Sequence, residues 1–208
     1  MHAPPELRGS FATRLTALVA GLFLCALGVV LFLESELGLP PWDVLHQGIA
    51  KHTPLSFGVA NEVVGLIVLL LAWALGARIG IGTAANAILI GLFVVLLQPL
   101  VTTHAIAGVD LPGRIALLAA GLVLFGVGSA LYIGAALGAG PRDSLMLVGA
   151  QRTGLRLGWV RALIESTVLV AGFALGGHVG VGTVVFAALI GPAVETSFWL
   201  FSRTALAR

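Results

Sequence analysis

The residues best suited to chemistry are the few charged and amide side chains that lie inside long apolar segments. A charge at the centre of a bilayer costs about 2.5–3.5 kcal/mol on insertion scales, so such residues usually face a cavity or a partner. These residue types predict a polar cavity that binds a small molecule or an ion. The candidates to line it are Glu165, Arg161, Glu62, Asn61, Asn86 and Glu195.

Glu165 is the strongest of these candidates because it lies about two turns into an apolar segment. Arg161 stands one turn before it, and side chains at i and i+4 meet on a helix surface. An intrahelical ion pair without a function explains the two residues equally well. For Glu62 and Glu195, proximity to a wet interface is the simpler interpretation.

The sequence carries no recognisable set of catalytic or metal-binding residues. It contains no H-E-x-x-H, no G-x-S-x-G and no His/Cys cluster with metal-ligand spacing. His46 and His52 are six residues apart and share no helical face well, so we expect solvated histidines at an interface. The single cysteine, Cys25, excludes an internal disulfide and is expected to be buried and inert. We therefore expect neither an enzyme nor a cofactor or metal site.

The composition requires a membrane environment for the whole chain. Of its 208 residues, 59% are hydrophobic and only 10% are charged, against roughly 25% charged residues in a soluble domain. The net charge of +2 comes from scattered Lys and Arg residues, which favours an orientation signal over a nucleic-acid surface. The lipid bilayer is thus the expected partner of a single membrane domain.

Apolar stretches of about 20 residues predict an all-α polytopic bundle with six transmembrane helices. They lie at about 14–33, 59–76, 81–100, 114–133, 158–176 and 180–201.

The chain is also a tandem duplication, since a shift of one hundred positions aligns it with itself without a gap. Repeat 1 covers about 14–100 and repeat 2 about 114–200, after an N-terminal tail of residues 1–13. Each repeat then holds three spans, and an odd number places the second repeat in the opposite direction across the membrane. Such inverted repeats recur in transporters.

The distribution of positive charge supports this topology. With the N-terminus inside, nine Lys and Arg residues fall in cytoplasmic segments and only Lys51 and Arg114 fall outside. This is the bias that the positive-inside rule describes. We expect a bacterial plasma-membrane protein with both termini in the cytoplasm, residues 34–58 outside and 134–157 inside.

Two kinds of repeated motif separate the spans. Pro41 and Pro141 suit the first turn of a short helix, at 41–52 and 141–152, with Asp43 and Asp143 placed at its positive end. These helices are too short to cross, so they are either interfacial or re-entrant. We expect both aspartates to act mainly as helix-start residues.

The second motif joins the last two spans of each repeat. Its glycines are expected to form a tight turn whose threonine caps the following helix. The alternative is a set of free amides that favours an anion. The residues are Gly80, Gly82 and Thr83, repeated as Gly180, Gly182 and Thr183.

These motifs together resemble the YczE-like bacterial membrane proteins, which are related to the broader YitT group. The resemblance implies a bacterial inner-membrane protein and no defined chemistry. Members often carry an acidic residue shortly after the Ile-Gly of the third span, which repeat 1 lacks and repeat 2 provides as Glu195. The resemblance to this family rests on Leu37-Gly38 with Pro41-Trp42-Asp43 and His46, on Leu55 to Gly58, and on Leu75-Gly76 with Gly80-Ile81-Gly82-Thr83, Asn86 and Gly91.

Two function classes fit this sequence. The first is a small inverted-repeat transporter or permease whose site lies between the repeats. The second is a membrane factor that does not transport, such as a partner or substrate-capture subunit of a larger complex. A homo-oligomer is compatible with either class. The sequence names no substrate or coupling ion.

Overall fold

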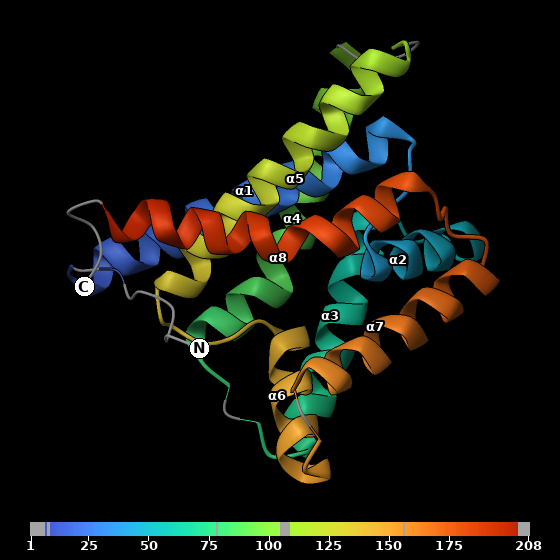
Figure 1. Cartoon of the computed structure of the whole chain (residues 1–208). Coiled ribbons are helices and arrows are strands. Elements are labelled where there is room, and N and C mark those ends of the chain that lie inside the picture. The colour runs from blue at the N-terminus through green and yellow to red at the C-terminus, as the bar shows by residue number, and fades with distance from the viewer. Residues whose placement is uncertain (1–6, 8, 78, 105–108, 156, 204–208) are drawn as a thin grey trace.

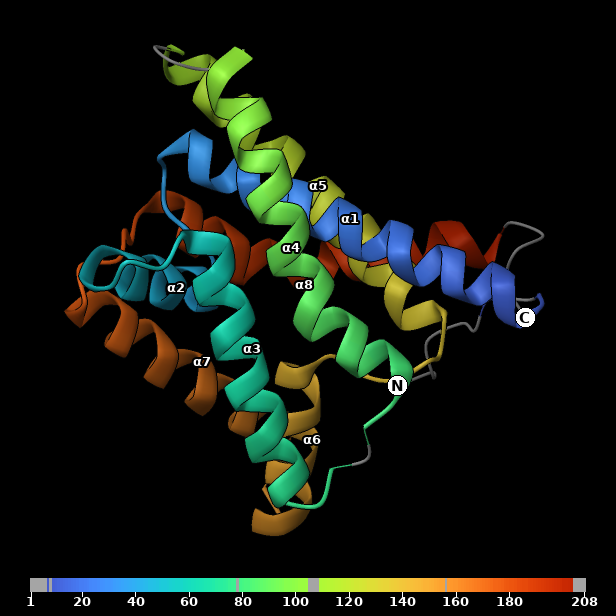
Figure 2. The same ribbon diagram turned by 180° about the vertical axis from the view of Figure 1, so that it is seen from behind.

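The computed structural model describes residues 7, 9–77, 79–104, 109–155 and 157–203, and over these it is a bundle of eight α-helices (Figures 1 and 2). Most of the predicted N-terminal tail lies outside the described residues, as do Arg8, Arg78, Arg156 and Arg208 of the charge count. The helices are α1 (Phe11–Ser35), α2 (Pro41–His52), α3 (Phe57–Ala74), α4 (Ile81–His104), α5 (Leu111–Gly134), α6 (Pro141–Thr153), α7 (Leu157–Ala174) and α8 (Val181–Ser202).

After the shift of one hundred, each helix of the second half begins at the same position as its equivalent in the first half. Local sequence explains the starts. Ser10, Ser56 and Asp110 cap α1, α3 and α5, each accepting a hydrogen bond from the amide three residues on. Pro41 and Pro141 occupy the first positions of α2 and α6, as predicted.

Five of the described helices are long and apolar enough to cross a membrane: α1, α3, α4, α5 and α8. They coincide with five of the six predicted spans. The remaining prediction, 158–176, is helical as α7 but is not among the five, so its role as a span stays a prediction.

The core is the contact between α1 and α5, which lie side by side in both views (Figures 1 and 2). Gly21 faces Gly128 and Gly28 faces Gly121, so the two helices are antiparallel. A Cβ at Gly21 would lie 2.6 Å from the carbonyl oxygen of Gly128. Only glycine allows the backbones to approach this closely.

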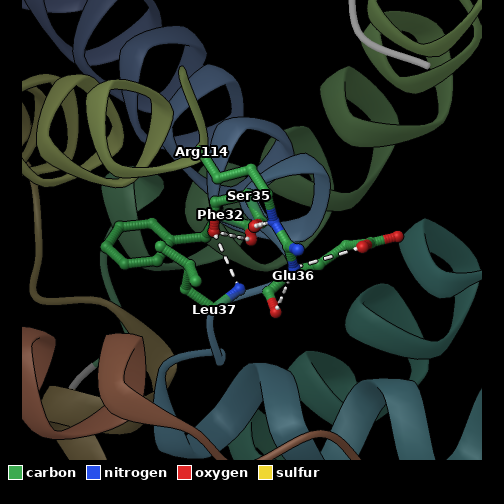
Figure 3. A network of polar contacts seen from close by, with 5 residues as sticks. All are labelled: Phe32, Ser35, Glu36, Leu37 and Arg114. Carbon is green, nitrogen blue, oxygen red and sulfur yellow. Dashed lines mark hydrogen bonds and ion pairs between the residues drawn. The ribbon is translucent and has the colours of Figure 1, made fainter. Parts of the chain in front are cut away.

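Arginines at equivalent positions clamp the two ends of this contact. The guanidinium of Arg114 donates to the carbonyl oxygens of Ser35 (2.7 Å) and Glu36 (2.9 Å), where α1 ends (Figure 3). Arg14 does the same at the end of α5, on the carbonyls of Ala135 and Ala136. Each half of the chain thus donates an arginine to the end of the first helix of the other half.

The Gly-x-Gly-Thr turns also make contacts from each repeat to the other. The amide of Gly80 donates to Thr83 Oγ1 (3.1 Å) at the start of α4, which confirms the predicted cap. The next free amide, at Gly82, donates to the carbonyl of Leu137 in the other repeat (2.8 Å), as the amide of Gly182 does to Leu37 (2.7 Å). The amides of Gly82 and Gly182 therefore donate to carbonyls and are not free to bind an anion, as the alternative prediction required.

One packing contact differs between the two repeats. In repeat 1, α3 packs on α4, and a Cβ at Gly58 would lie 2.5 Å from Val95 Cγ2 and 2.7 Å from the Gly91 carbonyl oxygen. Over the described residues, α7 and α8 form no comparable seam. Nothing lies within 4 Å of the position where Gly191 would carry a Cβ. The two repeats therefore share a fold but differ in how their last two helices pack.

Candidate functional site: a buried polar cluster between the repeats

The first turn of α2 is buried where the two repeats exchange helices. Helix α2 packs on α7, and α6 packs on α3, so each short helix lies against the other repeat. Trp42, Leu45 and Ile49, which share one face of α2, pack in an apolar cluster with Val64 of α3 and Ile164 of α7. The polar side chains of this turn are held inside by that apolar packing.

Asp43, His46 and Asn61 form one arm of the polar cluster. His46 Nδ1 lies 3.1 Å from Asp43 Oδ1 and 3.2 Å from the side-chain nitrogen of Asn61. The exposed fractions of the three residues are 1%, 0% and 6%. The prediction of a solvated His46 is wrong, because its ring packs edge-to-face on Phe57 inside the bundle. His52, at the exposed end of the same helix, is solvated as expected.

Repeat 2 supplies the other arm. The hydroxyl of Tyr132 in α5 donates to Asp143 Oδ2 over 2.9 Å. The guanidinium carbon of Arg142 lies 4.9 Å from the centre of the Trp42 ring, within the range of a cation–π contact. Trp42 and Arg142 occupy equivalent positions in the two repeats. The cluster is therefore formed by residues of both halves of the chain.

Three buried polar atoms of this cluster have no hydrogen-bond partner among the residues that the structure describes. They are Trp42 Nε1, Asp43 Oδ2 and His46 Nε2. A buried polar group without a partner costs about 1–3 kcal/mol, and such groups in native proteins call for an explanation. Three within one helical turn indicate a place for a ligand, an ion or water.

The charges of the cluster act on one another at short range. Burial lowers the pKa of His46 and favours the neutral ring, whereas the hydrogen bond and the charge of Asp43 favour the protonated ring and Arg142 opposes it. Arg142 is itself within electrostatic reach of Asp43, Asp143 and Glu165. The site thus contains a cation between several carboxylates and an uncharged histidine.

Asn61 is the one predicted cavity residue with a hydrogen bond inside this cluster. Arg161 and Glu165 form the predicted intrahelical ion pair at 3.0 Å, with exposed fractions of 51% and 28%. Glu62 is half-buried and lies against Gly91 in the α3–α4 seam. The candidates from α3 and α7 therefore occupy three different environments.

The other two predicted residues lie in α4 and α8. Asn86 is half-buried and approaches Gly140, the residue before α6. Glu195 is exposed on α8. The structure does not bring Glu195 to the polar cluster.

The sequence analysis missed His46, Trp42, Arg142 and Tyr132 as members of the site. It also assigned Asp43 and Asp143 to helix starts, whereas their bonded partners are the side chains of His46 and Tyr132. One signal could have found the cluster: Trp42 and its equivalent Arg142 are unlike residues between a proline and an aspartate that both repeats share.

A polar pocket of about 530 Å³ opens beside α2. Gln47 and Lys51 of α2 line it, and they continue along the helix face on which Asp43 lies. The rest of the lining comes from Phe32, Leu33, Glu36, Gly38, Leu39, Arg114 and His178.

Comparison with known proteins supports the resemblance seen in the sequence. A family described as "Family of unknown function (DUF6198)" matches residues 12–197. An uncharacterised protein of Haemophilus influenzae is 40% identical over 182 residues, which cover 87% of this chain and 81% of the relative. The uncharacterised membrane protein YczE of Bacillus subtilis is 38% identical over 183 residues, covering 86% and 82%.

A more distant relative is the uncharacterised protein YyaS of Bacillus subtilis. It is 28% identical over 192 residues, covering 86% of this chain and 92% of the relative. No solved structure matches the chain significantly. YczE is described as a membrane protein, and five helices of this chain are long and apolar enough to cross a membrane. Both observations support a membrane location for the chain.

Proposed function

We propose that this chain, which belongs to the DUF6198 family of unknown function, is a small secondary transporter whose substrate or ion site is the buried polar cluster. The observation that carries the proposal is the contact of Arg142 with Trp42 beside three unpaired buried polar atoms. In inverted-repeat transporters, the site lies at the interface of the repeats, and short broken helices build it.

The inverted arrangement has its own support. Helices α1 and α5 are antiparallel, and the repeats exchange equivalent contacts at both ends of this pair. The beginning of α1 and the end of α8 lie at the same end of the molecule (Figures 1 and 2). With the charge bias, this favours two cytoplasmic termini in a bacterial plasma membrane, with α7 as the sixth span.

In this proposal, α2 and α6 are re-entrant half-helices. The first turn of α2 is buried, whereas Lys51 and His52 at its end are exposed. Backbone that is not a full span is tolerated at depth where it lines a cavity or is covered by protein. The proposed route to the site from one side of the membrane passes through the pocket beside α2, whose Gln47 and Lys51 lie one and two turns along the helix from Asp43.

The unequal seams support alternating access. The α3–α4 seam is packed, whereas the equivalent α7–α8 seam is not. Exchange of these two conformations between the repeats would open the cluster to the opposite side of the membrane. The repeated glycines Gly91 and Gly191 allow either seam to close.

A ligand-stabilisation screen on the purified protein in detergent tests the proposal. Small ions and organic molecules are ranked by the shift in unfolding temperature, and hits are then tested for uptake into proteoliposomes. A true substrate stabilises the wild type and Glu195→Gln, an exposed control, but not Asn61→Ala. Equal stabilisation of all three proteins, or hits that are never transported, would refute the assignment.

A second candidate function is a partner subunit that does not transport. The observation that favours it is Glu195, an exposed carboxylate on a helix that could span the membrane. A charge in contact with lipid is costly, so another subunit or a second copy of this chain would cover it. Cross-linking from Glu195→Cys in native membranes distinguishes the two functions, because a transporter that acts alone gives no cross-linked product.

A further inference from the structure

The unpaired atoms of the cluster restrict what the site accepts, and this argument rests on the proposed function. A carboxylate oxygen only accepts, and Asp43 Oδ1 lies 3.1 Å from His46 Nδ1, so the ring hydrogen of the neutral imidazole lies on Nδ1 and donates to Asp43. The Asn61 amide, whose oxygen and nitrogen exchange places by a flip, then turns its oxygen toward the same N–H. This leaves His46 Nε2 with a free lone pair. Asp43 Oδ2 is also an acceptor without a partner. The site therefore holds two adjacent acceptors in need of a hydrogen.

The charge of the surrounding groups points the same way. Two carboxylates, of Asp43 and Asp143, are opposed by the single guanidinium of Arg142 in their immediate surroundings. The neighbouring helices add Tyr132 from α5, which is neutral and donates to Asp143, and Asn61 from α3. Helix α7 adds Glu165, whose charge is balanced by Arg161. With a neutral His46, the cluster carries one uncompensated negative charge.

A metal cation suits these acceptors poorly. Hard cations such as Ca²⁺ and Mg²⁺ are bound by six or more oxygen ligands. The free acceptors here are one oxygen and one nitrogen. A proton needs only one lone pair and leaves no coordination shell to complete.

We infer that the Asp43–His46 pair is a proton-binding site and that one proton taken up there accompanies transport. The Nε2–H bond of His46 forms as an O–H bond of a hydronium ion from the aqueous phase breaks and water leaves, and the ring becomes an imidazolium whose Nδ1–H still donates to Asp43. The charge of the cluster rises from −1 to zero. Neutrality lowers the cost of closing the cluster off from water on both sides while the seams exchange, which gives the conformational exchange a reason to depend on the proton.

The experiment is an NMR titration of the purified protein, labelled with ¹⁵N-histidine, in detergent micelles. His46→Gln identifies the His46 signal, and His52→Gln, at the exposed end of the same helix, is the matched control. We expect the His46 signal to titrate reversibly at a pH below the ordinary range of a histidine, because the ring is buried. Asp43→Asn should lower the His46 midpoint further, by about 1–3 pH units, because an opposite charge is removed.

Arg142→Gln provides a second measurement should Asp43→Asn fold poorly. It removes a repelling cation and should raise the His46 midpoint. A His46 ring that never titrates, or whose midpoint ignores both substitutions, overturns the inference. A midpoint that depends on Na⁺ but not on choline also overturns it, in favour of a metal cation. Failure of the titration leaves the substrate screen unaffected, so the two proposals fail separately.

Discussion

The matched glycines Gly91 and Gly191 provide the sharpest test of the unequal seams. They are equivalent positions in α4 and α8, and both lie inside a helix. A Cβ at Gly91 would lie 2.6 Å from the carbonyl oxygen of Gly58, and it would also meet the side chain of Glu62. A Cβ at Gly191 meets nothing within 4 Å.

The magnitudes follow from this difference. Replacing glycine by alanine inside a helix stabilises it by about 0.5–1 kcal/mol, and this gain is common to both variants. Overpacking of a tight contact costs about 1–3 kcal/mol, and only Gly91→Ala incurs it. The free energy of unfolding should therefore be about 1–3 kcal/mol lower in Gly91→Ala than in Gly191→Ala, since the common gain cancels.

Thermal unfolding in detergent, followed by circular dichroism, measures the difference. One kcal/mol corresponds to about 2–4 °C for a chain of this size, so Gly91→Ala should melt about 2–12 °C below Gly191→Ala. Gly191→Ala should match or exceed the wild type. The reasoning is refuted if Gly191→Ala is destabilised as much as Gly91→Ala, because α8 would then be packed as tightly as α4.

Three further predictions each have a matched control variant. For topology, the exposed variants Thr53→Cys and Thr153→Cys are compared in a Cys25→Ala background in intact cells. An impermeant thiol reagent should label Thr53→Cys alone, and labelling of Thr153→Cys alone would reverse the proposed orientation. Arg114→Gln should lower the free energy of unfolding by about 1–3 kcal/mol, because two carbonyls at the end of α1 lose a charged donor. Arg161→Gln, in an exposed ion pair, should lower it by less than about 1 kcal/mol. Equal losses in thermal unfolding would contradict a stabilising role of the Arg114 contacts. Tyr132→Phe should weaken ligand-induced stabilisation more than Phe32→Tyr does, because only Tyr132 bonds to the polar cluster; the same screening assay that ranks substrates measures both.

Much of the secondary structure could be predicted because its signals are local. Proline at positions 41 and 141 starts a helix wherever the chain goes. The threonine three residues after Gly80 and Gly180 caps the next helix through bonds within four residues. Apolar stretches are long enough to cross a bilayer whatever their neighbours are.

The candidate site could not be predicted in the same way. His46 and His52 look alike in the sequence, yet one is enclosed by Phe57 and Asn61 and the other is exposed. The i,i+4 pair of Arg161 and Glu165 was found because it is local, and it lies partly in solvent-accessible space. Proximity in the sequence therefore favoured a pair that the fold leaves at the surface.

The sequence by itself determined the helical class, the duplication and the helix boundaries, because composition, periodicity and capping act over one or two turns. The tertiary structure alone decided that Trp42 meets Arg142 and that Asp43 bonds to a buried His46. It also decided that one of two equivalent seams is packed and the other is not. These features depend on contacts between residues far apart in the chain, and the same repeated glycine is compatible with either packing.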